Sequence, residues 1–419
     1  MVLTEVNEEY RRTKQKRKLM DRRVLVIVAT LVIVGFLKAT PIRSSYDATN
    51  FNTRESTNDK EAKEVLSPSP FFDEILNNLV SDWRSSRVSA ESAKQTVWDI
   101  IQSPLYKNHH PNKGIVFIKT HKTGSSTITA LLHSLATSHG LTAAISNQDG
   151  KLFKTKDKIL NLPTTNPDHP NGAPYDVWSN HVVFDEILIN EAVPTSEGKL
   201  FSIVRDPGTR IRSACRFNGC CPAKTSEEWT KFILNSTIDS FKKKKKFCEL
   251  NQSFKEINGG APSYKALIGL EHQVRQGNLL LMVTERFIES VLILRDFYDL
   301  HPLDIVFFPM KVMEHPIGSK NSDLITAEEK MREWNKYDTA IHKLANSTLS
   351  KKMEEIYPQQ ANRVRAVEEM ETLNDLLHHV CSKELKNVVP ELNSWCDEKT
   401  MDNIPWCRKH LKIHSNFNQ

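Results

Sequence analysis

The chain has 419 residues, of which 39% are hydrophobic and 26% charged, a composition typical of a globular protein with one large or two modest domains. Its formal net charge is +6 at pH 7, but eight Lys/Arg and four Asp/Glu place +4 of this charge in residues 1–23. The rest of the chain is almost neutral, which argues against a protein that coats nucleic acid, so we expect no nucleic-acid partner.

The N-terminal region has the pattern of a membrane anchor. An uninterrupted apolar run at 24–37 follows the basic segment and ends before Lys38. Because basic residues stay on the cytosolic side, we expect a cytosolic basic tail at 1–23, a transmembrane signal anchor at 24–38 and a luminal remainder, as in a single-pass type II protein. As a helix the run would span only about 21 Å, which suits thin early secretory membranes. A cleaved signal peptide is the alternative.

The segment 39–110 is predicted to be a stem. Ser, Thr, Asn and Asp are frequent up to about residue 70, which favours a flexible chain. Helices are expected at 71–84 and 90–102, where they would pack onto the folded body.

Sequons and cysteines agree with the luminal placement. Asn-x-Ser/Thr sequons place candidate glycosylation sites at Asn235, Asn251 and Asn346, and all seven cysteines lie in the second half of the chain. The cysteine spacing forms no four-ligand zinc pattern, so we expect disulfides and no metal site. An odd count leaves one thiol free or bridging to another chain, which leaves room for a homodimer.

One loop combines several features of an anion site. A short apolar strand is expected at 114–118 and a helix at 125–139, and the loop between them supplies backbone N–H groups, hydroxyls, one glycine and the positive end of a helix dipole. This is not a Walker A loop, because its second lysine comes two residues before the only glycine, so a metal-bound nucleoside triphosphate is not the expected ligand. The candidate residues are Lys119, Thr120, His121, Lys122, Thr123, Gly124, Ser125, Ser126 and Thr127.

A second strand–loop–helix unit begins at residue 200. The apolar strand 200–204 leads directly into Arg205, and Asp206 followed by proline is a typical helix start. A guanidinium at the strand end and the hydroxyl of Ser213 on the helix would suit a second phosphate. The alternative is that Arg205 pairs with Asp206 at a surface turn.

Between these units, strands are expected at 141–146 and 177–184, the second of which contains His181. A lone histidine there is also typical of a hydrogen-bonded core residue. Farther along, the pattern predicts further strands and amphipathic helices, and this alternation indicates an α/β protein with a mostly parallel sheet flanked by helices. These strands are 279–283 and 305–308, and the helices are 263–276, 288–298, 326–344 and 361–385. The five lysines at 242–246 are read as a solvated face, with binding of acidic ligands as the alternative.

These motifs resemble the galactose 3-O-sulfotransferases, a family of Golgi carbohydrate sulfotransferases. Residues 117–127 are similar to the family's 5′-phosphosulfate loop, and 204–213 to its 3′-phosphate motif. The segment 284–294 supports the same subfamily, and the resemblance covers about 112–356. It implies a P-loop-like sulfotransferase domain at 111–360, followed at 361–419 by a helical, cysteine-containing extension.

The resemblance also implies a mechanism and a place of action. The donor would be 3′-phosphoadenosine 5′-phosphosulfate, with no metal, and the loop with Lys122 would hold its 5′-phosphosulfate while Arg205 and Ser213 hold its 3′-phosphate. His181 is the first candidate for the base that takes the acceptor proton, and His121 is the second. The acceptor would be a terminal galactose on a glycolipid of the galactosylceramide type or on a glycoprotein glycan. The catalytic domain would lie in the Golgi lumen.

The sequence leaves two other functions open. One is a glycosaminoglycan O-sulfotransferase acting on uronic acid or hexosamine, for which the lysines at 242–246 would line an acidic polymer cleft. The other is a non-catalytic, membrane-anchored glycan-binding protein, although the presence of Lys122, Arg205 and Ser213 argues against lost chemistry.

Overall fold

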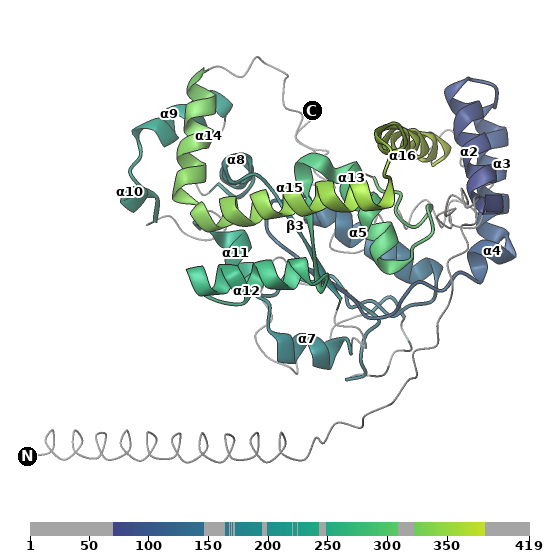
Figure 1. Cartoon of the computed structure of the whole chain (residues 1–419), viewed down its shortest axis with the longest axis horizontal. Helices are drawn as coiled ribbons and strands as arrows, with labels where there is room; N and C mark the ends of the chain where they lie inside the picture. Colours follow the sequence, from purple (N-terminus) through teal and green to yellow (C-terminus); the bar gives the residue numbers. More distant parts are fainter. Residues whose placement is uncertain are drawn as a thin grey trace, which may run out of the picture. The chain divides into compact units, whose positions relative to one another are not determined.

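A four-stranded parallel sheet with the order β2-β1-β3-β4 forms the centre of the fold (Figure 1). The computed structural model describes residues 70–145, 164–166, 168, 170, 172–194, 199–219, 221–223, 225–242, 249–308 and 322–381. The strands are β1 (Ile115–Ile118), β2 (Val177–Trp178), β3 (Leu200–Val204) and β4 (Leu279–Val283). Every neighbouring pair in the sheet is parallel, so all four strands end at the same edge.

Apart from Ser202 in β3, the strands consist of apolar residues, because both faces of the sheet are covered. Residues of β1 and β4 are all buried. In β1, Ile115 and Phe117 join the large core cluster, whereas Val116 joins a smaller one with Trp178 and Ile189. Since side chains alternate along a strand, these two clusters occupy opposite faces.

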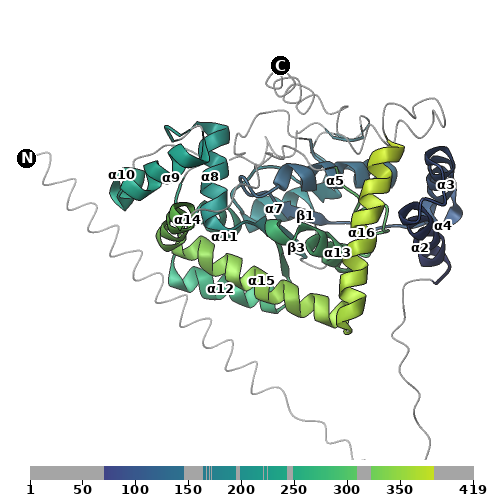
Figure 2. The ribbon, with the colours of Figure 1, turned by 90° about the horizontal axis from the view of Figure 1, so that it is seen from above.

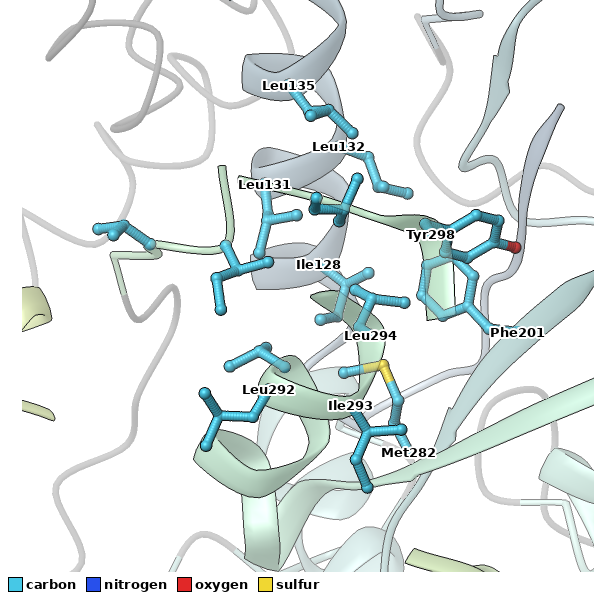
Figure 3. Close-up of a cluster of buried hydrophobic side chains, with 14 of the residues drawn as sticks. Ile128, Leu131, Leu132, Leu135, Phe201, Met282, Leu292, Ile293, Leu294 and Tyr298 are labelled. Carbon is cyan, nitrogen blue, oxygen red and sulfur yellow. The ribbon is translucent and has the colours of Figure 1, made fainter. Parts of the chain in front are cut away.

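Helices follow the strands and pack against them. The bounds are α2 (Pro70–Arg84), α3 (Ala90–Gln102), α4 (Pro104–Lys107), α5 (Ser125–Ser138), α7 (Glu186–Ala192), α8 (Pro207–Asn218), α9 (Ser226–Asn235), α10 (Ile238–Lys242), α11 (Gln252–Asn258), α12 (Tyr264–Arg275), η1 (Thr284–Arg286), α13 (Phe287–Tyr298), α14 (Ser322–Trp334), α15 (Lys336–Ile356) and α16 (Gln360–Val380). Helices α12, α13 and α15 contact β4. Leucines and isoleucines of α5 and α13 meet beside Phe201 and Met282 of the sheet (Figure 3).

Two further groups of helices extend this body. Helices α2 and α3 pack on α16, as both ribbon views show (Figures 1 and 2). Helices α8, α9 and α14 pack on one another around the buried Trp229 and Met331. The long helix α15 links these groups, because it contacts α14 at one side and α13 and α16 at the other.

The structure confirms an α/β architecture with a parallel sheet and corrects several predicted elements. The strand predicted at 141–146 is reduced, in the residues described, to isolated bridges at Ala143 and Ala144. The strand 177–184 ends at Trp178, so His181 lies beyond it. The apolar run 305–308 is not a strand, and the helix 326–344 is two helices separated at Asn335.

Several predictions fall on residues that the structure does not describe. The tail, anchor and stem up to residue 69 lie outside the described residues, as do the lysines at 243–246 and the chain after 381. Within the part that is described, no helix is both long enough and apolar enough to cross a membrane.

Candidate active site

The loop at 119–124 lies at the edge of the sheet where the parallel strands end. It connects β1 to α5, and Thr284 after β4 joins it to the end of β3. The Thr284 hydroxyl lies 2.7 Å from the carbonyl oxygen of Thr123 and 3.0 Å from that of Val204, and it shares its one proton between them. The ends of β1, β3 and β4 therefore converge on the loop. Ligands of open parallel sheets bind at this edge.

Two residues of the loop adopt the left-handed conformation that turns the chain into α5. Lys122 has φ 64° and Gly124 has φ 79°. Glycine adopts this conformation without strain, and a Cβ at position 124 would lie 3.6 Å from the ring of Phe287. The turn leaves the first N–H groups of a 14-residue helix at the sheet edge, where a helix end favours an anion.

The hydroxyls of the loop fall into two groups. Those of Thr120 and Ser125 hold the loop itself, because Thr120 donates to Ile203 O at 2.5 Å and Ser125 donates to Thr120 O at 2.6 Å. The hydroxyl of Thr123 also lies 2.8 Å from that of Thr120. Ser126 is only half-buried at the start of α5, so it is better placed for a ligand.

The two lysines of the loop have different surroundings. Lys119 is buried, whereas the Nζ atom of Lys122 lies 3.4 Å from the ring centroid of Phe217 at the end of α8. A cation over an aromatic ring at a partly exposed site gains only about 0.5–1 kcal/mol. A hydrogen bond between the Lys122 ammonium and a phosphate is stronger than this contact, so a bound phosphate can replace it.

Arg205 is a cation held by neutral oxygens. Its Nε donates to Thr209 Oγ1 at 3.1 Å and its Nη1 donates to Lys122 O at 3.4 Å, so it links α8 to the loop. In the described part of the chain no carboxylate forms a salt bridge with it. The alternative pairing with Asp206 is wrong, because the Asp206 carboxylate binds Arg332 at 2.6 Å.

Burial lowers the pKa of Arg205 from its ordinary value, and the positive charges of Arg212 and Arg210 lower it further. The negative charges of Glu285 and Asp206 act in the opposite direction. Burial would also raise the pKa of Glu285, but hydrogen bonds from His342 and from the Asp206 N–H lower it overall. Glu285 therefore stays an anion beside the start of α8. Ser213 is buried in the second turn of α8.

The two candidate histidines lie face to face. Their rings are stacked with 4.0 Å between centroids. His181 Nδ1 lies 3.2 Å from Lys119 O, and since a carbonyl only accepts, Nδ1 carries the proton and Nε2 keeps its lone pair. His121 Nδ1 is hydrogen-bonded to the carboxylate of Glu256 on α11, and the His121 N–H donates to the same carboxylate at 3.0 Å. His121 is the more buried of the two rings.

The three sequon asparagines have different environments. Asn235 is exposed at the end of α9. Asn251 caps α15, because its side-chain carbonyl accepts from Tyr337 N at 2.9 Å. Asn346 lies within α15 and donates its amide to His342 O at 3.0 Å. Asn235 is therefore the most accessible of the three.

One pair of cysteines is joined. Cys215 and Cys221 form a disulfide with 4.9 Å between Cα atoms, and Cys381 is also disulfide-bonded. Among the residues described, no group of three or more His, Cys, Asp or Glu side chains is arranged to hold a metal ion. The bonded state of Cys215, Cys221 and Cys381 agrees with the expectation that the cysteines form disulfides.

Sequence reasoning missed three contacts that shape this site. Phe217 and Glu256 lie in segments without a recognisable motif, and only the fold brings them to the loop. Thr284 belongs to the segment 284–294 that supported the family resemblance, but its role in joining the strand ends was not evident. Together, the site offers a helix end, two cations and two stacked bases, which can hold a bivalent anion and accept a proton.

Comparisons with known proteins agree with this chemistry. The sequence profile of the galactose-3-O-sulfotransferase family matches residues 11–402. Galactose-3-O-sulfotransferase 4 of Bos taurus is 33% identical over 121 residues, 28% of this chain and 24% of that protein. Human galactosylceramide sulfotransferase is 22% identical over 291 residues, 65% of this chain and 64% of that protein. Human galactose-3-O-sulfotransferase 3 is 23% identical over 268 residues, 59% of each.

The alignments thus span from about a quarter to just under two thirds of the length of these relatives. No solved structure matches the chain with significance.

Proposed function

Because the chain belongs to the galactose-3-O-sulfotransferase family, we propose that it transfers a sulfuryl group from 3′-phosphoadenosine 5′-phosphosulfate to the 3-hydroxyl of a galactose. The observation that carries this proposal is the partly buried Arg205, which contacts the anion loop and has only neutral hydrogen-bond partners among the described residues. A guanidinium in this setting is suited to a phosphate. The donor carries two separated phosphate groups, and the site offers two adjoining cationic positions.

Two groups of residues at the sheet edge are proposed to bind the two ends of the donor. Lys122, the N–H groups of 123–127 and the hydroxyls of Ser126 and Thr127 hold the 5′-phosphosulfate and stabilise the charge that develops on the leaving phosphate. Arg205 and Ser213 hold the 3′-phosphate. The buried Lys119 and the structural hydroxyls of the loop keep it in the conformation that presents these groups.

His181 is the proposed base. It takes the proton of the galactose 3-hydroxyl while that oxygen bonds to sulfur and the bond from sulfur to the 5′-phosphate oxygen breaks. Two observations support it over His121: its Nδ1 is hydrogen-bonded to Lys119 O, which holds the ring beside the loop, and its ring is less buried. His121 remains the second candidate.

The acceptor is proposed to be a terminal galactose of a glycolipid or a glycoprotein glycan, since relatives include galactosylceramide sulfotransferase and galactose-3-O-sulfotransferases. We propose that the protein acts in the Golgi as a single-pass type II membrane protein, anchored by residues 24–38, with its catalytic domain in the lumen. The basic and apolar segments that precede residue 38 support this topology.

An acceptor screen tests the proposal. The purified protein and the labelled sulfate donor are incubated with galactosylceramide, a lactose-type oligosaccharide and a heparin-like glycosaminoglycan, and the position of the sulfate on the product is then determined. We expect sulfate on the 3-hydroxyl of galactose. Transfer to the glycosaminoglycan alone would contradict the proposal and favour the uronyl or hexosamine class.

A further inference from the structure

One residue, Glu256, contacts both histidine-bearing segments of the site. The side chain of Glu256 on α11 binds the ring and the backbone N–H of His121, as described above. Its carbonyl oxygen accepts a hydrogen bond from the N–H of Phe184 at 2.9 Å, three residues after His181. Glu256 is therefore the point at which the loop after β1 and the loop after β2 are joined to α11.

The surroundings of Glu256 require a carboxylate. Besides the two donors of His121, the amide of Gln252 donates to Glu256 Oε1 at 3.0 Å. A buried carboxylate can accept three such hydrogen bonds, whereas a glutamine would turn an NH2 group toward at least one of these donors. The His121 and Glu256 side chains are only 10% and 6% exposed, so water cannot replace a lost partner.

The carboxylate is itself fixed by a buried chain of polar groups. Gln252 accepts from Arg210 Nη1 at 3.3 Å, and Arg210, which is fully buried, contacts the Asp338 carboxylate at 3.5 Å. Asp338 in turn accepts from Phe254 N at 2.8 Å. Helices α8, α11 and α15 thus all contribute to holding Glu256 in one position.

The close approach of α11 to the His181 segment leaves no room for adjustment. A Cβ at Gly259, which ends α11, would lie 2.2 Å from the carbonyl oxygen of Phe184. The backbone that carries His181 is therefore packed directly on the end of the helix that carries Glu256. A change in the Glu256 side chain leaves this backbone contact intact.

We infer that Glu256 is a positioning residue of the transfer reaction: its carboxylate fixes the tautomer and plane of the His121 ring, on which the base His181 stacks. The inference rests on the proposed function. With Nδ1–H bound to the carboxylate, the His121 ring is held in one tautomer and one plane, and this ring in turn supports the His181 ring that stacks on it.

The test is a double-mutant cycle in the full chain. Glu256→Gln is expected to lower kcat for sulfuryl transfer about 10- to 100-fold, as loss of an orienting partner does elsewhere, with the donor KM changed less than about twofold. In a His121→Asn background the same change should have almost no further effect, because Glu256 acts through His121. Glu249→Gln is the matched control, since this carboxylate lies in the same segment but is half-exposed and pairs with Lys255.

A spectroscopic measurement separates positioning from folding. In histidine-labelled protein, long-range proton–nitrogen correlation spectra report which ring nitrogen carries the proton, and His121→Asn assigns the signal. We expect Nδ1–H in the wild type and Nε2–H in Glu256→Gln. An unchanged kcat in Glu256→Gln, an equal loss in both backgrounds, or an Nε2–H tautomer in the wild type would each overturn the inference.

Failure of the proposed function is distinguishable from failure of this inference. If the wild type neither binds adenosine 3′,5′-bisphosphate nor transfers sulfate, the proposed function fails and the catalytic role of Glu256 falls with it. If the wild type is active and only the Glu256 results disagree, the proposed function stands and the positioning role alone is wrong.

Discussion

Arg205→Lys should weaken binding of adenosine 3′,5′-bisphosphate although the positive charge is kept. The guanidinium is placed by Thr209 and by the carbonyl of Lys122, so its remaining N–H groups reach outward as a fixed fork. An ammonium on a flexible stem cannot reproduce both the anchoring bonds and a bidentate contact to phosphate. The substitution therefore removes at least one hydrogen bond to a charged group.

The size of the effect follows from that bond. A hydrogen bond to a charged group contributes about 1.5–3 kcal/mol, which corresponds to a roughly 10- to 150-fold rise in Kd. Isothermal titration calorimetry with the bisphosphate measures it directly. Arg216→Lys on the same helix is the matched control, because Arg216 is exposed and should bind as the wild type does. An affinity of Arg205→Lys within about twofold of the wild type would refute a 3′-phosphate site at Arg205.

Two further substitutions test the base and the buried interior. His181→Ala should lower kcat about 10²- to 10⁴-fold without unfolding the protein, and full activity would instead assign the base to His121. His133 bonds to Ser179 Oγ at 2.9 Å, and burial, with the charge of Lys119, lowers its pKa to about 4. Because the unfolded chain binds that proton below about pH 6.5, stability should fall by roughly 3 kcal/mol between pH 6.5 and 4. Denaturant titrations of His133→Gln should show a flatter pH dependence, and an unchanged slope would contradict a buried neutral ring.

The sequence was sufficient for the parts of the site that lie next to one another in the chain. The apolar strand, glycine turn and helix around Lys122 are a local pattern, and the structure reproduces it with β1 and α5. The same holds for β3, whose bounds at 200–204 were predicted, and for the Asp206 cap of α8. Such elements depend on neighbours within a few residues, which one sequence displays.

Contacts between distant segments could not be predicted in this way. Glu256 is 135 positions from His121, and nothing in its own segment marks it as a partner. The run 305–308 was wrongly predicted to be a strand, because a short run of apolar residues has the same sequence pattern whether it forms a buried strand or a buried loop. There the Phe307 N–H donates to the side chain of Asn374 at 3.1 Å rather than to a neighbouring strand.

Sulfate transfer by the Lys122→Ala variant tests the central claim most directly. Lys122 is the cation of the loop that is proposed to hold the 5′-phosphosulfate, and its Nζ atom lies over the ring of Phe217. The wild type and the variant are compared with the labelled sulfate donor and a galactose-terminated acceptor. We expect transfer to the 3-hydroxyl by the wild type and a loss of about 100-fold or more in the variant. Full activity of Lys122→Ala would contradict it.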